Sequence, residues 1–228
     1  MTLLITILPS IVILFYFINS DKFKEPKRVI IEVFCLGVVT TIPAGYFNSL
    51  IVDTFSTGNK INDAALTGFF AGGLVEEALK FSILYFFVLR KNEFNEPMDA
   101  IVYGVVVSLG FATLENLNYV YFYADNFNAT GLEVAKARAW TAVPMHGLNG
   151  CVMGFYFGLS VFTGKKKYLS YALIMPYLFH GTYNFLVGLE FIYAIGILII
   201  LIIKSVSLHK NLKFAQKEKV SEHEKKLI

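Results

Sequence analysis

Long apolar segments alternate with short polar ones along almost the whole chain. A helix needs about 20 mostly apolar residues to cross a hydrocarbon core roughly 30 Å thick. The last apolar segment has 36 residues, which is too long for one span, so it predicts two spans divided near 188–190, the second of them short. The pattern therefore predicts an all-α, polytopic membrane helix bundle with about seven transmembrane helices, built from segments 2–18, 29–52, 64–89, 100–123, 139–163 and 168–203.

Beyond the last apolar segment the chain changes character. Residues 205–228 mix Lys and Glu with few apolar residues, so we expect a solvated basic tail held near anionic lipid by charge. The predicted organisation is an integral membrane domain at 1–204 and a cytoplasmic tail at 205–228. For acidic residues at the ends of spans, such as Asp99, stabilising the start of a helix is a sufficient role.

Composition agrees with a membrane domain. Of the 228 residues, 56% are hydrophobic and only 16% are charged, against about 25% charged residues in a typical soluble domain. This excludes a disordered chain, a nucleic-acid-binding module and an ordinary cytosolic enzyme. Cys35 and Cys151 both lie within apolar segments, which predicts two buried free thiols instead of a disulfide framework.

The distribution of basic residues predicts an orientation. Segments 20–28, 90–98, 164–167 and the chain after 203 carry 16 of the 20 Lys and Arg residues. The alternate segments carry only three, namely Lys60, Lys136 and Arg138. Because basic residues concentrate in cytoplasmic loops, we expect a multi-pass cell-membrane protein with its N-terminus outside and its C-terminus in the cytoplasm.

Polar residues within the predicted spans mark a candidate site. An ionisable side chain at the centre of a membrane costs about 2.5–3.5 kcal/mol on insertion scales, so it usually faces a cavity or a partner and marks function. At 1.5 Å per residue, those of four different spans fall at one level between the midplane and the outer face. We expect them to form one site in a four-helix catalytic core, with the residues Glu76, Glu77, Lys80, Glu115, Asn116, His146, His180 and Asn184.

Spacing within the spans indicates how these groups pair. Lys80 is four residues from Glu76 and three from Glu77, so it can neutralise either carboxylate on its own helix. Three carboxylates and one ammonium still leave an excess of negative charge, so the site holds a proton on a Glu or binds a cation. Glu115 is predicted to position a His or to share a proton with the Glu pair. Asn116 has a supporting role, for which hydrogen bonding between helices is the alternative.

These motifs carry a family resemblance. They are Glu-Glu-Ala-Leu-Lys at 76–80, the run 99–116 ending in Glu-Asn, His146 with the glycines after it, and His-Gly-Thr-Tyr-Asn at 180–184. In this order on four spans they resemble the PrsW family of bacterial intramembrane proteases, which is distantly related to the type II CAAX prenyl proteases. The resemblance implies site-1 cleavage of a single-span anti-sigma factor near the extracytoplasmic side, which leads to activation of a sigma factor.

Peptide hydrolysis needs an activated water, a stabilised oxyanion and a proton for the leaving amine. We expect Glu76 or Glu77 to act as the base, with His146 orienting the water. His180 and Asn184 share a helix face four residues apart and are expected to donate hydrogen bonds to the oxyanion. This mechanism requires no cofactor.

Two alternatives use the same residues differently. In the first, a zinc ion held by His146, His180 and Glu76 supports the same reaction, although the compact H-E-x-x-H helix of many metalloproteases is missing from the sequence. In the second, the protein is a proton- or cation-coupled transporter. The expected partners are the lipid bilayer and a single-span substrate contacted by loops 53–63 and 124–138, with no nucleic acid.

Overall fold

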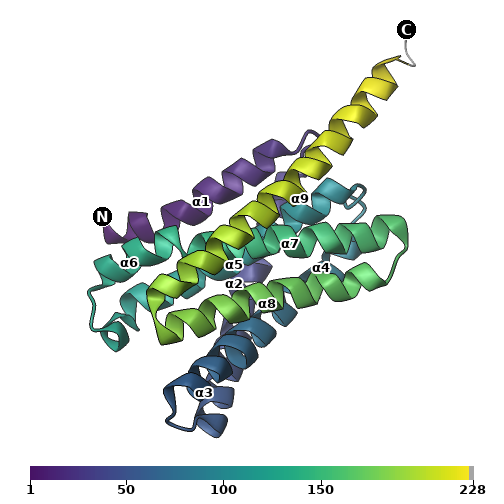
Figure 1. Cartoon of the computed structure of the whole chain (residues 1–228). Coiled ribbons are helices and arrows are strands. Elements are labelled where there is room, and N and C mark those ends of the chain that lie inside the picture. The colour runs from purple at the N-terminus through teal and green to yellow at the C-terminus, as the bar shows by residue number, and fades with distance from the viewer. Residues whose placement is uncertain (226–228) are drawn as a thin grey trace.

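The computed structural model describes residues 1–225, with side chains up to residue 217, and the regular structure in this part of the chain is helical throughout (Figure 1). This confirms the predicted all-α membrane bundle. The elements are α1 (Thr2–Ser20), α2 (Lys27–Phe55), α3 (Lys60–Ala65), η1 (Leu66–Glu76), α4 (Glu77–Phe86), η2 (Val88–Arg90), α5 (Pro97–Tyr121), η3 (Ala124–Phe127), α6 (Gly131–Trp140), α7 (Ala142–Thr163), α8 (Lys167–Leu189) and α9 (Phe191–Lys225).

Seven long helical segments follow the predicted spans, the third being made of α3, η1 and α4. Among the described residues, α1, α2, α5 and the part of α9 up to residue 217 are long and apolar enough to cross a membrane by themselves. The other three segments carry most of the polar residues of the predicted site. The expected break near 188–190 is confirmed, because α8 ends at Leu189 and α9 begins at Phe191.

The last helix differs from the expectation. Instead of a short span followed by a solvated tail, α9 is one helix of 35 residues that passes residue 204 without a break. Ser205, His209 and Gln216 are buried, and the Ser20 hydroxyl at the end of α1 lies 2.7 Å from Nε2 of His209. The tail up to residue 217 therefore packs one face on the bundle, and the division into two domains at 204/205 stays a prediction.

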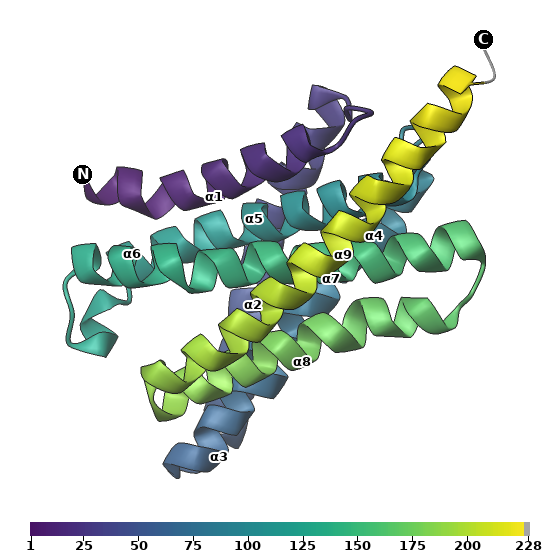
Figure 2. The ribbon, with the colours of Figure 1, turned by 45° about the horizontal axis from the view of Figure 1, so that its top comes forward.

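Helix α5 forms the centre of the bundle, with α1, α2 and α7 packed around it (Figure 2). Glycines allow its close approach to α7. A Cβ on Gly104 would lie 2.4 Å from the carbonyl oxygen of Gly150, and a Cβ on Gly154 would lie 2.1 Å from that of Ala100. Such contacts replace the hydrophobic effect as the force that holds helices together in lipid.

The two cysteines are free thiols in different surroundings. Cys151 is buried, as expected. Cys35 is exposed, so the prediction of two buried thiols was wrong for it. It lies on a face of α2 that the rest of the protein leaves uncovered. Such exposure suits a small apolar side chain on a helix that faces lipid.

The third segment is not a regular α-helix. Residues Leu66–Glu76 form a π-helix, a rare conformation that is frequent at functional sites. Glycines on this stretch bring it against α8, because a Cβ on Gly68 would lie 2.8 Å from the carbonyl oxygen of Gly181. The π-helix ends at Glu76 and α4 starts at Glu77, so the change of helix type coincides with the first predicted motif.

Candidate active site

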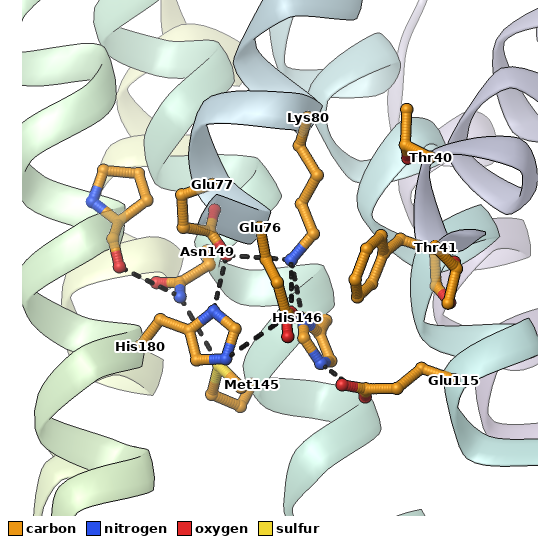
Figure 3. A network of polar contacts seen from close by, with 12 residues as sticks. Thr40, Thr41, Glu76, Glu77, Lys80, Glu115, Met145, His146, Asn149 and His180 are labelled. Atoms are coloured by element: carbon orange, nitrogen blue, oxygen red, sulfur yellow. Dashed lines mark hydrogen bonds and ion pairs between the residues drawn. The ribbon is translucent and has the colours of Figure 1, made fainter. Parts of the chain in front are cut away.

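The polar residues predicted from four spans meet in the interior of the bundle, as Figure 3 shows. They come from the junction of η1 and α4, from the second half of α5, from the first half of α7 and from the second half of α8. Six of the eight predicted residues lie within hydrogen-bonding or ion-pair distance of another of the six. The connected residues are Glu76, Glu77, Lys80, Glu115, His146 and His180.

Lys80 lies at the centre of the cluster and is fully buried. Its Nζ is 2.9 Å from Oε1 of Glu77, 3.0 Å from Nδ1 of His146 and 3.7 Å from Oε2 of Glu76 (Figure 3). It also lies 4.2 Å above the centre of the Phe111 ring, a favourable position for a cation. The buried ammonium thus lies between two carboxylates and an imidazole, where its charge stabilises them.

Glu77 fixes the orientation of His180. Nδ1 of His180 lies 2.7 Å from Oε1 of Glu77 and donates its proton there. A neutral imidazole then has no proton on Nε2, which is left as an acceptor. This Nε2 lies 3.8 Å from Oε2 of Glu76, itself an acceptor that is buried without a hydrogen-bond partner. Two acceptors that face each other at this distance define a place for a donor of two protons, such as water, or for a cation.

Of the two adjacent glutamates, Glu76 is the one that the cavities reach, and Glu115 lines only the smaller cavity. Glu76 lines both a cavity of about 770 Å³ and a second one of about 520 Å³, whereas Glu77 lines neither. Asn48 of α2 donates a hydrogen bond of 3.1 Å to Oε1 of Glu76 and leaves Oε2 available. The structure therefore separates the two neighbouring glutamates into one that faces the cavities and one enclosed by Lys80 and His180.

Arg138 is a member of the site that the sequence did not reveal. His146 Nε2 lies 3.0 Å from Oε2 of Glu115, and Nη2 of Arg138 pairs with the same oxygen. Nε of Arg138 donates to Oδ1 of Asn116 at 2.8 Å. The sequence predicts an outer loop for Arg138, but it lies in the last turn of helix α6 and its guanidinium reaches Glu115. Its charge reduces the formal excess of the cluster, with three carboxylates against two cations, to −1.

The asparagines take different positions. Asn116 also donates from Nδ2 to the carbonyl oxygen of Thr6 on α1 at 2.8 Å, so it does hydrogen-bond between helices. Asn184 lines the larger cavity. A Cβ on Gly72 would lie 2.4 Å from Nδ2 of Asn184 and 3.6 Å from Nε2 of His180, which places both side chains on the face of α8 that packs against η1.

The donor set also fits a metal ion. One ligand atom from each of Glu76, His146 and His180 lies within 4.8 Å of the other two. Oε2 of Glu76 has no hydrogen-bond partner, and Glu77 orients the His180 ring as a carboxylate orients a metal-bound histidine. Both nitrogens of His146, however, already have partners in Lys80 and Glu115. A metal that used this histidine would have to displace the Lys80 ammonium from Nδ1 or the Glu115 carboxylate from Nε2.

Comparisons with known proteins agree with the motifs. A family model described as a PrsW family intramembrane metalloprotease matches residues 25–208. The chain is 38% identical over 184 residues to Protease PrsW of Bacillus subtilis, which covers 79% of each protein. It is 36% identical over 181 residues to Protease PrsW of Geobacillus kaustophilus, covering 78% of this chain and 76% of that one. Protease PrsW of Clostridioides difficile is 30% identical over 205 residues, covering 88% of this chain and 84% of that one. No solved structure matches the chain.

Proposed function

Because the chain belongs to the PrsW family of intramembrane proteases, we propose that it hydrolyses a peptide bond of a single-span membrane protein with Glu76 as the general base. The observation that supports this role is the unpartnered Oε2 of Glu76, which faces Nε2 of His180 at 3.8 Å and lines both cavities. Family membership makes the protein a membrane peptidase and sets aside the transporter alternative.

The first step is attack by water. A water between Glu76 and His180 donates one hydrogen bond to Oε2 and one to Nε2, so its oxygen lone pair points into the cavity. Glu76 takes a proton from the water as its oxygen forms a bond with the carbonyl carbon of the peptide. Glu77 and Lys80 act as positioning residues, since they hold His180 and His146 and do not reach the cavity.

The second step breaks the peptide bond. The proton on Glu76 passes to the leaving nitrogen, the C–N bond breaks, and a carboxylic acid and an amine result. Of the two expected oxyanion donors, we propose Asn184 alone, because Asn184 lines the larger cavity while His180 donates its ring proton to Glu77. His146 contacts Lys80 through one ring nitrogen and Glu115 through the other, so it acts as a positioning residue.

A metal-dependent form of the reaction uses the same residues. Zinc bound by Glu76, His146 and His180 would supply a Lewis acid and an activated water. Glu77 would then orient His180, and Glu115 would orient His146. We propose the metal-free form, because the Lys80 ammonium already stabilises the carboxylates and the imidazole that a metal would join.

The residues that line the larger cavity support a membrane-embedded substrate with an external part. Its walls include Asp53 at the end of α2, Phe127 in η3 and Glu133 in α6, which belong to the two loops predicted to contact the substrate. These loops lie at the same end of the bundle as the N-terminus (Figure 1). With the N-terminus outside, cleavage would take place toward the extracytoplasmic side. We propose, in line with the family resemblance, that the substrate is an anti-sigma factor whose cleavage activates a sigma factor.

The test follows the length of a candidate anti-sigma factor in cells that produce Glu76→Gln. The matched control is Glu190→Gln, the same exchange at an exposed glutamate that lines neither cavity. We expect a truncated product with the parent and with the control, and only full-length substrate with Glu76→Gln. Truncation that continues with Glu76→Gln would refute the proposed base. A substrate left intact by the parent would refute its identity.

A further inference from the structure

A second group of carboxylates lies at the opposite end of the bundle. Asp21 follows the last residue of α1, Glu25 lies in the connection to α2, and Asp99 lies in the first turn of α5. One carboxylate oxygen from each of the three lies within 4.8 Å of the other two. Asp99 and Glu115 are 16 residues apart on α5, which is about 24 Å along a helix. This group is therefore separate from the candidate active site.

Two of these carboxylates are buried and incompletely satisfied. Asp21 is 3% exposed and Asp99 is 1% exposed. Oδ1 of Asp21 accepts hydrogen bonds from the backbone N–H of Phe23 and from Nε2 of Gln216, and Oδ2 of Asp99 accepts from two backbone N–H groups of the preceding turn. The remaining oxygens, Oδ2 of Asp21 and Oδ1 of Asp99, are buried without a partner. An unpaired buried carboxylate oxygen is costly.

Cations of the protein do not neutralise the group. In the part of the chain that the structure describes, Asp21, Glu25 and Asp99 have no Lys or Arg within ion-pair distance. The Tyr103 hydroxyl donates to Oε2 of Glu25. Three carboxylates this close together repel one another when all are ionised, so the group holds a proton or binds a cation.

We propose that Asp21, Glu25 and Asp99 bind a hard divalent cation, Mg²⁺ or Ca²⁺, that joins the α1–α2 connection to the start of α5. Both ions prefer oxygen ligands, and carboxylates from three positions supply them without a nitrogen or sulfur donor. Glu25 is only partly buried, which leaves a path from solvent to the ion. The Gln216 amide extends the connection to α9, because it donates to Asp21 and to Glu96. The site does not depend on the proposed catalytic mechanism.

The test uses the purified full-length protein in detergent, stripped of metal with EDTA and titrated separately with Ca²⁺ and Mg²⁺. We expect one of the ions to raise Tm by roughly 5–10 °C at a concentration a hundred times its Kd. Asp21→Asn should lose this increase, whereas the same exchange at exposed Asp125 should keep it. His180→Ala should also keep it, because it changes only the candidate active site.

A second readout reports occupancy directly. Tb³⁺ occupies Ca²⁺ sites and luminesces when a nearby tyrosine is excited, and Tyr103 contacts Glu25. We expect sensitised luminescence that the divalent ion displaces and that Asp21→Asn removes. In EDTA, Asp21→Asn should melt no lower than the parent, since it removes one of the clustered charges. The proposal is overturned if neither ion raises Tm and no Tb³⁺ signal forms, because a proton then satisfies the group. It is equally overturned if Asp21→Asn responds to the ions as the parent does.

Discussion

Removal of the Lys80 ammonium tests whether the cluster is held together by this buried cation. Lys80→Met keeps an unbranched side chain of similar length and leaves Glu77 buried, with His180 as its remaining partner. Loss of one partner of a buried ion pair costs about 3–5 kcal/mol. For a chain of this size each kcal/mol lowers Tm by about 2–4 °C, so we expect Tm to fall by roughly 6–20 °C. Thermal unfolding in detergent, followed by intrinsic fluorescence, measures the change.

Two further variants separate charge from packing. Lys60→Met is the matched control, because Lys60 is exposed and lies 4.0 Å from the exposed carboxylate of Glu190; such a surface pair contributes about 0–1 kcal/mol. Adding Glu77→Gln to Lys80→Met removes the unpaired charge, and we expect it to recover part of the lost Tm. A Lys80→Met protein that melts within 2 °C of Lys60→Met, or a double variant that recovers no Tm, would contradict this role of Lys80.

Three other predictions concern activity. Gly72→Ala places a Cβ 2.4 Å from Nδ2 of Asn184, the mobile end of a side chain, so we expect slower cleavage at nearly unchanged Tm. The control is Gly196→Ala, where a Cβ meets nothing within 4 Å, and it should leave the cleavage rate and Tm unchanged. Equal cleavage rates for the two variants would contradict the role of Asn184. Arg138→Lys keeps the charge but loses the planar guanidinium that donates a hydrogen bond to Glu115. We expect the cleavage rate to fall about 10–100-fold, as it does when other supporting contacts of a site are removed. A cleavage rate equal to that of the parent would mean that the charge alone suffices. Metal analysis of the purified protein should find less than stoichiometric zinc and cleavage unaffected by chelation, whereas stoichiometric zinc whose removal abolishes cleavage would overturn the metal-free mechanism.

The candidate site could be predicted because ionisable residues are rare in membrane spans. The cost of placing Glu76, Glu115, His146 or His180 in lipid makes each of them visible in an apolar segment, and a count at 1.5 Å per residue puts them at one level. The structure brings them together. Their roles stay proposals. The hydrogen bonds of the structure distinguish Glu76 from Glu77, whereas the sequence shows only two adjacent glutamates.

Other features lacked such a signal. Arg138 is 23 residues from Glu115 in sequence and precedes an apolar segment, where a basic residue is ordinary. The π-helix of η1 has no distinct hydrophobic period, since its composition is that of any glycine-rich span. The packing of the tail did leave a trace, because Ser205, His209 and Gln216 lie at helical spacing on one face. The acidic group around Asp21 depends on three helix ends that meet only in the folded protein.

We propose that Glu76 activates the water that cleaves the substrate. The cleavage rate of purified Glu76→Gln, in liposomes that contain the single-span substrate and beside Glu190→Gln, measures this role. Loss of a general base lowers a rate by about 10²–10⁴, so we predict a fall of at least a hundredfold with Glu76→Gln at a Tm close to that of the parent. A Glu76→Gln protein that cleaves within a few-fold of the parent rate would contradict the account.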